Sequence, residues 1–177
     1  MTLLVTGSAG FIGSCFVRQH FDYSLEPIVS LDALTYAGHL STLAPVAEKL
    51  QHAFVHASIG DVDAVRAILN QHKPRAIVNF AAESHVDRSI LGPGAFIETN
   101  VVGTYRLLEC AREYWNGLTG DAKNEFRFLH VSTDEVYGTL GPADAPFAET
   151  HRYEPNSPYS ASKAASDHLV RAWHHTY

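Results

Sequence analysis

The chain has 177 residues, of which 46% are hydrophobic and 18% charged, and its formal net charge is −6. This length and composition fit one globular domain with a sizeable core, and they exclude a disordered chain or two full domains. The negative charge argues against nucleic acid or an anionic membrane surface as a partner. A small anionic ligand stays possible, because backbone amides can hold it locally.

The sequence also bears on the cellular compartment. No apolar run approaches the ~20 residues of a membrane span, and the N-terminus lacks the basic-then-apolar pattern of a signal peptide. Cys15 and Cys110 are far apart and belong to no CxxC motif, which is typical of buried thiols in a reducing compartment. The 11 histidines are scattered without zinc-type spacing. We therefore expect a cytoplasmic protein, and we predict no metal site.

A glycine-rich turn stands near the N-terminus. The apolar run 2–6 leads into Gly7-x-x-Gly10-x-x-Gly13, and a helical pattern follows through Phe21. Gly7 permits a tight turn, Gly10 lets a phosphate approach the backbone, and Gly13 lets the helix pack closely on the strand. Free amides at the helix start would then face a pyrophosphate. The strand before and the helix after favour a dinucleotide-binding turn over an ordinary glycine-bearing turn.

An acidic residue follows the second expected strand. The strand at 27–31 ends in Asp32, which lies 19 positions after Gly13. This spacing is close to the ~20 residues expected for the carboxylate that binds the adenosine ribose of a dinucleotide. Such a carboxylate would repel a 2′-phosphate, so the sequence favours NAD over NADP. The alternative is an acid that caps a turn or a helix.

The rest of the chain alternates strands with helices. We predict strands at 52–56, 75–80 and 126–131. Helices are expected near 39–50, through 72 with Asp61 as its cap, at 95–115, and from 158 to the chain end. The segments 116–125 and 139–156 are predicted to be loops. The polar stretch 83–89 is either part of a site or a solvated loop. This alternation predicts an α/β fold, a Rossmann-type doubly wound parallel sheet in strand order 3-2-1-4-5, with a single domain over 1–177.

A hydroxyl and two adjacent carboxylates, those of Thr133, Asp134 and Glu135, follow the apolar strand at 126–131. Neighbouring side chains in a strand point to opposite faces, so strand geometry must end by Asp134 if both acids are to meet one ligand. Chemistry is common at strand ends in open α/β sheets. The alternative is a helix cap or a solvated turn.

Tyr159 and Lys163 are four residues apart near the start of the last helix, so they share a helix face. An ammonium near a phenol favours the phenolate and lowers the pKa of the phenol. The pair would then provide a base that takes a proton from a carbinol as hydride leaves to a nicotinamide. The alternative is a chance pair on a surface helix.

Taken together, the glycine turn and the Tyr159-x-x-x-Lys163 pair resemble the extended short-chain dehydrogenase/reductase superfamily. Within it, the segments 34–38, 81–89, 132–138 and 158–163 are similar to the dTDP-glucose 4,6-dehydratase family, and the resemblance covers the whole chain. The Asp134-Glu135 pair is its most specific element, because sugar-nucleotide 4-epimerases of the superfamily usually lack two carboxylates there.

The resemblance implies an NAD-dependent lyase that converts dTDP-glucose to dTDP-4-keto-6-deoxyglucose by internal hydride transfer. Tyr159, assisted by Lys163 and Thr133, would take the proton of the sugar 4-hydroxyl. Glu135 would remove the C5 proton, and Asp134 would protonate the departing 6-hydroxyl. The resemblance places two residues, Ser84 and Thr133, on the substrate. With the motifs above, it assigns the NAD site to Gly7, Gly10, Phe11, Ile12, Gly13, Asp32, Leu34, Thr35, Ser58, Ile59, Ala81, Ala82, Ser84, Thr99, Tyr159 and Lys163.

The sequence departs from the family pattern in two respects. Ser58 stands where members usually carry an Asp that contacts the adenine, which would weaken NAD binding. Members also continue past the Tyr-Lys helix into a C-terminal substrate domain, whereas this chain is truncated there, at Tyr177. The alternatives are a sugar-nucleotide 4-epimerase and a catalytically inactive NAD-binding fragment. The family further implies a homodimer through the helices near 95–115 and 157–177.

Overall fold

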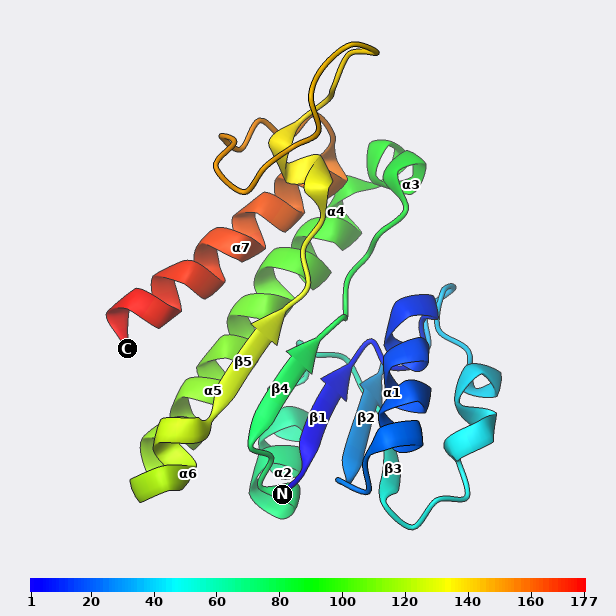
Figure 1. Ribbon diagram of the computed structural model, residues 1–177, viewed down its shortest axis with the longest axis vertical. Coiled ribbons are helices and arrows are strands. Elements are labelled where there is room, and N and C mark those ends of the chain that lie inside the picture. Colours follow the sequence, from blue (N-terminus) through cyan, green and yellow to red (C-terminus); the bar gives the residue numbers. More distant parts are fainter. The chain divides into compact units, whose positions relative to one another are not determined.

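The computed structural model describes residues 1–177, and Figure 1 shows the arrangement of its elements. In chain order these are β1 (Leu3–Thr6), α1 (Phe11–Tyr23), β2 (Ile28–Asp32), the 3-10 helix η1 (Leu40–Val46), β3 (His52–His56), α2 (Val62–His72), β4 (Ala76–Asn79), α3 (Val86–Leu91), α4 (Pro93–Phe96), the π-helix η2 (Ile97–Gly103), α5 (Thr104–Gly117), α6 (Gly120–Glu125), β5 (Arg127–His130), the 3-10 helix η3 (Asp134–Tyr137) and α7 (Pro158–Thr176). None of these helices combines the length and the apolar character needed to cross a membrane.

The backbone divides into two compact units. The first comprises residues 1–81 and 106–131, and the second comprises 82–105 and 132–177. The first unit holds all five strands, and the second holds α3, α4, η2, η3 and α7. The single domain predicted over 1–177 stays a prediction.

The sheet of the first unit confirms the predicted topology. Its five strands are all parallel and lie in the order β3-β2-β1-β4-β5. In the centre of the sheet, Leu4 of β1 lies opposite Val29 of β2 and Ile77 of β4. All residues of β1, β2 and β4 are buried, as expected of parallel strands that are covered on both faces.

Two hydrophobic clusters cover the two faces of this sheet. Leu4 and Ile77 belong to the cluster that includes buried residues of α2 and α5, whereas Leu3 and Val5 belong to the cluster that includes Val17 of α1. Neighbouring residues of one strand therefore enter different clusters, which is the alternation that a pleated strand imposes.

The helices differ from the prediction in four places. The long helix predicted at 95–115 is α4, η2 and α5, with a π-helical stretch over Ile97–Gly103. The polar stretch 83–89 contains the start of α3, the predicted loop at 116–125 contains α6, and the helix near 39–50 shortens to η1. Tertiary contacts stabilise α6, since the Trp115 indole donates to the Lys123 carbonyl at 3.1 Å and the Lys123 ammonium lies 4.2 Å from the Trp115 ring centroid.

The second unit is organised around α7, which packs against α3, α4, η2 and η3. Ser157 and Ser160 form a capping box at its start, and Pro158 occupies the first turn as predicted. The segment 139–156 has no helix or strand, which confirms the predicted extended loop. Aromatic contacts join this segment to η3: the ring centroid of Tyr137 lies 5.5 Å from that of Phe147 and 5.3 Å from that of Tyr153.

Candidate active site

The glycine turn of the first unit brings backbone segments into close contact. Gly7 has a φ of +61°, and a Cβ atom there would lie 2.6 Å from the Ala81 amide nitrogen. A Cβ atom on Gly13 would lie 2.1 Å from the Gly7 carbonyl oxygen. Both positions therefore require glycine, because the contacting atoms belong to the backbone and cannot move aside. The close packing predicted for Gly13 is present.

The start of α1 provides the features of a dinucleotide site. Its N-cap residue, Gly10, makes no side-chain capping hydrogen bond, and no acidic residue stands in the first turn. Phe11 and Ile12 are 91% and 61% exposed, and the buried Ser8 hydroxyl has no hydrogen-bond partner. A pyrophosphate would find amide donors here, and apolar side chains are available beside it. The residues present therefore fit a dinucleotide.

Asp32 holds the glycine turn against the end of β2. It is only 8% exposed. Its Oδ2 accepts a hydrogen bond from the Ala9 amide at 2.8 Å, and its Oδ1 accepts one from the Leu34 amide at 2.8 Å. A carboxylate has about four acceptor positions, so it could still bind ribose hydroxyls. Thr35 closes the turn that follows, since its carbonyl accepts from the Gly38 amide at 3.1 Å.

The other predicted cofactor residues of the first unit lie in different surroundings. Ile59 contributes its side chain to the core and is 3% exposed. Ser58 is exposed, and its hydroxyl accepts from the Gly60 amide at 3.1 Å in the turn before α2. Ala81 is half-buried, and its amide donates to the Thr6 hydroxyl at 3.3 Å. The carboxyl ends of β1 and β4 are thus tied to each other just before Ala82.

Sequence reasoning missed a polar relay at these strand ends. Thr6 Oγ1 donates to Asn79 Oδ1 at 2.5 Å, and Asn79 Nδ2 donates to His130 Nδ1 at 2.9 Å. The relay joins the ends of β1, β4 and β5, and both Thr6 and Asn79 are fully buried. The available signal was a polar residue at the last position of each of three apolar strands, where parallel strands place their ends at one edge.

In the second unit, the predicted acid pair lies on a 3-10 turn. Thr133 caps η3 by accepting from the Glu135 amide at 3.3 Å, so the cap expected as an alternative is present. Asp134 is exposed and Glu135 is half-buried. Strand β5 ends at His130, which confirms that strand geometry stops before Asp134.

Tyr159 lies against this turn. It is 9% exposed, its side chain forms a hydrogen bond with that of Thr133, and its ring packs edge-on against Phe96. Burial raises the pKa of Tyr159, and the hydrogen bond with Thr133 lowers it. The carboxylates of Glu135, Asp134 and Asp167 raise it further, so the net pKa lies above the ordinary value of a phenol. The predicted lowering of this pKa by Lys163 is therefore wrong for the chain by itself, because burial and nearby negative charge outweigh any effect of the ammonium.

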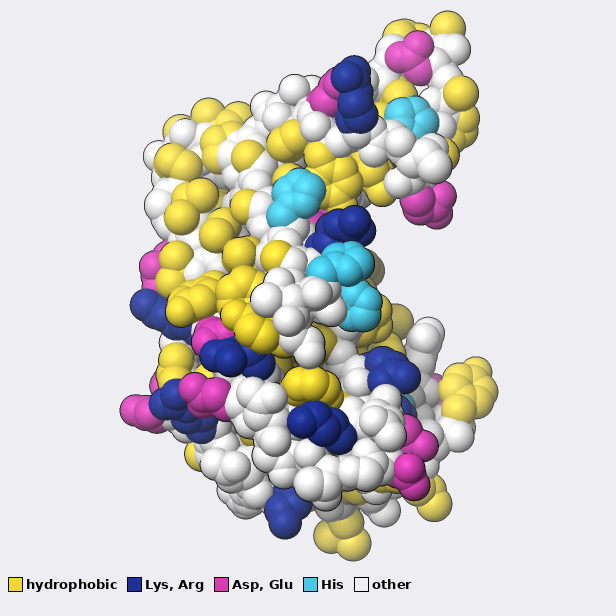
Figure 2. All heavy atoms as spheres, turned by 90° about the vertical axis from the view of Figure 1, so that its left-hand side faces the viewer, with side chains coloured by type: hydrophobic (Ala, Val, Ile, Leu, Met, Phe, Trp, Pro, Cys, Tyr) yellow, Lys and Arg dark blue, Asp and Glu magenta, His cyan; other side chains and the backbone are white.

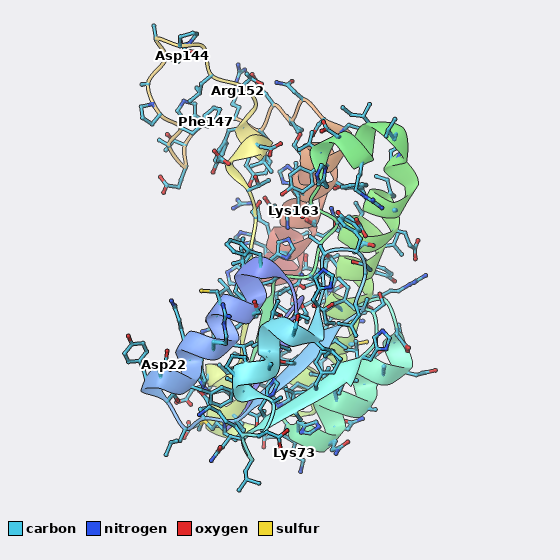
Figure 3. All side chains as sticks on the ribbon, turned by 90° about the vertical axis from the view of Figure 1, so that its right-hand side faces the viewer. Asp22, Lys73, Asp144, Phe147, Arg152 and Lys163 are labelled. Carbon is cyan, nitrogen blue, oxygen red and sulfur yellow. The ribbon has the colours of Figure 1, made fainter.

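Lys163 lies one helical turn after Tyr159 on α7 and is 3% exposed (Figure 3). Burial lowers the pKa of Lys163, and the carboxylate of Asp167 raises it; the net pKa is below the ordinary value. Burial and the Asp167 carboxylate therefore act in opposite directions on the ammonium form of Lys163.

Asn100 organises the remaining candidate residues of this unit, and the sequence prediction assigned it no role. Its Oδ1 accepts from the Glu83 amide at 2.8 Å, and its Nδ2 donates to the Glu83 carbonyl at 2.9 Å and to the Ser162 hydroxyl at 2.8 Å. It lies in the π-helix η2, a type of distortion that is frequent at functional sites. Ser84 follows Glu83 and is exposed, whereas Ala82 and Thr99 are half-buried.

The predicted residues thus form two groups, one in each unit. The first unit brings together Gly7, Gly10, Gly13, Asp32 and Ala81 around one turn, and Phe11, Ile12, Leu34 and Thr35 adjoin them in sequence. The second unit brings together Thr133, Glu135 and Tyr159 at the start of α7, with Lys163 one turn further on. The side chain of Ile59 belongs to the core, and its predicted contact with NAD stays a prediction.

Comparison with known proteins identifies the family. The family model described as GDP-mannose 4,6 dehydratase matches residues 4–177. The chain belongs to the GDP-mannose 4,6 dehydratase family. A family relative, the dTDP-glucose 4,6-dehydratase of Xanthomonas campestris, is 62% identical over 99% of this chain. The alignment covers 50% of that relative, so the chain spans about half the length of the curated relatives it matches.

Solved structures agree with this family assignment. DesIV, a dTDP-glucose 4,6-dehydratase of Streptomyces venezuelae solved with NAD bound, is 48% identical in sequence to this chain, and the two structures superpose with a TM-score of 0.88. The match covers 100% of this chain and 52% of DesIV. A UDP-glucose 4-epimerase of Thermotoga maritima is 28% identical with a TM-score of 0.84, covering 100% of this chain and 52% of the epimerase. The resemblance and the fold class expected from the sequence are thereby confirmed.

Proposed function

We propose that this chain is the NAD-binding part of a dTDP-glucose 4,6-dehydratase. The observation that carries the proposal is the Asp134-Glu135 pair on a 3-10 turn, beside a Tyr159 whose phenol is hydrogen-bonded to Thr133. Two carboxylates next to a phenol provide the separate acid and base that a dehydration requires after a carbinol is oxidised. The likeness to dehydratases of known name supports the same conclusion.

The first unit would hold the cofactor. The pyrophosphate would lie at the start of α1, over Gly10, where amides are uncapped by any side chain. Asp32 would accept from the adenosine ribose with the acceptor positions that the Ala9 and Leu34 amides leave open. Bound NAD would supply a hydride acceptor and, in its oxidised form, a positive charge. The other NAD contacts, including Ser58, Ala82, Ser84 and Thr99, belong to this proposal.

The second unit would perform the proton transfers. Tyr159 takes the proton of the 4-hydroxyl, Thr133 holds the phenol in place, and Lys163 provides an ammonium on the same face of α7. The ketone formed at C4 acidifies the C5 proton, which Glu135 removes. Asp134 protonates the departing 6-hydroxyl, which leaves as water and gives a C5–C6 double bond. Formation of the 4-keto-6-deoxy product then requires that the hydride removed from C4 be delivered to C6 and that a proton be returned to C5. Ser84 and Thr133 would contact the sugar.

The pH dependence of the proton transfer follows from the surroundings of Tyr159. Because its pKa is raised, the phenol is protonated at neutral pH, and the fraction able to act as a base increases as the pH rises. The rate of 4-hydroxyl oxidation should therefore increase with pH. A positive charge bound near the phenol would move this increase to lower pH.

We also propose a homodimer in a reducing, cytoplasmic compartment. Figure 2 shows hydrophobic side chains gathered on the face that carries α7. Ile97, Tyr105 and Tyr177 of the second unit are 48%, 45% and 55% exposed. Cys15 and Cys110 are free thiols, which fits a reducing compartment. Light scattering of the purified chain tests the dimer, since a monomeric mass at micromolar concentration would exclude it.

The decisive experiment for the reaction is a chimera that joins residues 1–177 to the C-terminal half of the Xanthomonas campestris relative. Incubated with dTDP-glucose and NAD in deuterated water, it should form the 4-keto-6-deoxy sugar and exchange the C5 proton. Glu135→Gln in the same chimera should abolish that exchange, and retained exchange would exclude Glu135 as the base. A product that keeps its 6-hydroxyl would identify a 4-epimerase.

Cofactor binding can be measured on the 177-residue chain directly. A ligand that binds the native state alone stabilises it by ~2.7 kcal/mol at a hundredfold excess over its dissociation constant. NAD should therefore raise the melting temperature clearly, and NADP should raise it less because of Asp32. An equal effect of the two dinucleotides would contradict the role given to Asp32.

A further inference from the structure

The second unit contains a carboxylate, that of Asp167, which the proposed reaction does not use. Asp167 lies on α7 one turn after Lys163 and two turns after Tyr159, so the three residues lie along one side of the helix. Its Oδ2 atom accepts two hydrogen bonds. One comes from the Ser132 hydroxyl, and the other comes from the Tyr153 hydroxyl at 3.1 Å.

These two hydrogen bonds join separate segments of the unit to α7. Ser132 immediately precedes Thr133, which caps η3 and forms a hydrogen bond with Tyr159. Tyr153 belongs to the segment 139–156, which has no regular structure, and its ring also lies 5.1 Å from that of His168 on α7. Figure 3 labels Asp144, Phe147 and Arg152 on that segment and Lys163 on α7. Hydrogen bonds to a carboxylate are roughly twice as strong as those between neutral groups, and this one side chain connects both segments to α7.

The charge of Asp167 acts on the same residues. Lys163 is almost completely buried, and Asp167 is the charged group that favours its ammonium form. The elements packed against α7 carry other charged or titratable side chains, namely His85 before α3, Asp87 and Arg88 on α3, Glu98 on η2, and Asp134, Glu135 and Tyr137 on η3. Of these, Asp134 and Glu135 act on Tyr159 together with Asp167, and none is a cause of the shift at Lys163.

We propose that Asp167 is a positioning residue of the candidate active site. Its carboxylate fixes the Ser132–Glu135 segment and the 139–156 segment on α7, and it balances the buried ammonium of Lys163. This inference rests on the proposed function for its purpose, because the groups that it holds are the proposed proton donors and acceptors. The hydrogen bonds and the charge themselves can be tested without turnover.

The charge is tested by Asp167→Asn, whose amide oxygen can still accept hydroxyl hydrogen bonds. The titration of Lys163 is followed by NMR in the 177-residue chain with isotope-labelled lysine. The titration midpoint should move to lower pH in Asp167→Asn and stay near the wild-type value in Ser132→Ala, which keeps the carboxylate. An unchanged midpoint in a folded Asp167→Asn variant would overturn the role of the charge.

The geometry is tested by removing each hydroxyl alone. Amide hydrogen exchange should become faster at residues 133–135 in Ser132→Ala and at residues 139–152 in Tyr153→Phe. Tyr23→Phe is the matched control, since Tyr23 is 91% exposed at the end of α1. Unchanged exchange in both variants would overturn the positioning role, even if Asp167→Asn failed to fold.

The NAD-induced shift in melting temperature is measured on the same samples. A wild-type chain without an NAD shift would contradict the proposed function, while the Lys163 titration and the exchange rates would still decide the role of Asp167. A normal NAD shift combined with an unmoved Lys163 midpoint would contradict the inference alone. The two failures are therefore distinguishable.

Discussion

Different kinds of interaction stabilise the interior of each unit. In the first unit, parallel strands bury apolar side chains in two clusters, one on each face of the sheet. In the second unit, polar side chains connect the segments around α7: Asn100 bonds to the backbone of Glu83, Asp167 accepts from Ser132 and Tyr153, and Ser157 caps the helix. Apolar burial tolerates small changes in shape, whereas each polar contact is lost as a unit when one partner is removed. The scaffold and the candidate proton-transfer group should therefore respond to different mutations.

The largest effect on stability is expected in the core of the first unit. Ile77 lies in the central part of the sheet and is fully buried, so Ile77→Ala should lower the free energy of unfolding by about 2–5 kcal/mol through lost burial and a cavity. Leu50→Ala is the control, because Leu50 is 100% exposed and should change stability by less than about 0.5 kcal/mol. Urea unfolding measures both. A cost for Ile77→Ala below about 1 kcal/mol would contradict an apolar core as the main support of this unit.

The glycine turn connects stability to cofactor binding. In Gly13→Ala the new Cβ atom would meet the Gly7 carbonyl oxygen at 2.1 Å, which the backbone must move to relieve. We expect a loss of about 1–3 kcal/mol and the disappearance of the NAD-induced shift in melting temperature. Gly94→Ala is the matched control, since a Cβ atom there meets nothing within 4 Å, and it should be neutral or slightly stabilising. Normal NAD binding by Gly13→Ala would show that the turn does not hold the dinucleotide.

The second unit is tested by removing a buried amide. Asn100→Ala leaves the backbone amide and carbonyl of Glu83 without their side-chain partners, and it should cost roughly 1–3 kcal/mol. Asn70→Ala on the exposed face of α2 provides the comparison and should be nearly neutral. If the cost of Asn100→Ala were also near zero, polar contacts would not be what orders this unit.

The same contrast explains what the sequence could predict. The strands of the first unit were found within one or two residues because apolar runs and turn residues mark them, and the strand order follows from the alternation with helices. Asp61 was predicted as a helix cap from local chemistry, and its side chain caps α2. The candidate proton-transfer residues were found by motif, at Tyr159 and at the Asp134-Glu135 pair.

Features that depend on contacts beyond one helical turn were missed. Helix α6 forms where the Trp115 indole donates a hydrogen bond to the Lys123 carbonyl. The π-helix η2 departs from α-helical geometry around Asn100, whose side chain forms hydrogen bonds with Glu83 and Ser162. The raised pKa of Tyr159 reflects burial and carboxylates brought near it by the fold. Spacing along one helix shows which residues share a face, but it does not show how deeply that face is buried.

The smallest effect is expected at a surface ion pair of the first unit. Arg75 donates to both carboxylate oxygens of Glu26, at 2.5 and 2.7 Å, and this hydrogen bonding lowers the pKa of Glu26. Because that pKa is lower in the folded state than in the unfolded state, the pair stabilises the protein at neutral pH, and the contribution is lost as the pH falls through the lowered pKa. Partial exposure of both side chains limits the contribution, so Glu26→Gln should cost no more than about 1 kcal/mol at pH 7 and almost nothing in acid.

A matched pair in the second unit sharpens this last test. Arg152 and Glu154 are 3.0 Å apart, but their side chains are 89% and 61% exposed, so Glu154→Gln should have no measurable effect on unfolding in urea at either pH. The difference between the two variants at neutral pH isolates what the bidentate geometry and partial burial of Glu26 contribute. Equal costs would mean that the Glu26 pair is only a surface contact. The first unit would then owe its stability to the apolar clusters, and polar contacts would matter only where, as at Asn100, they are buried.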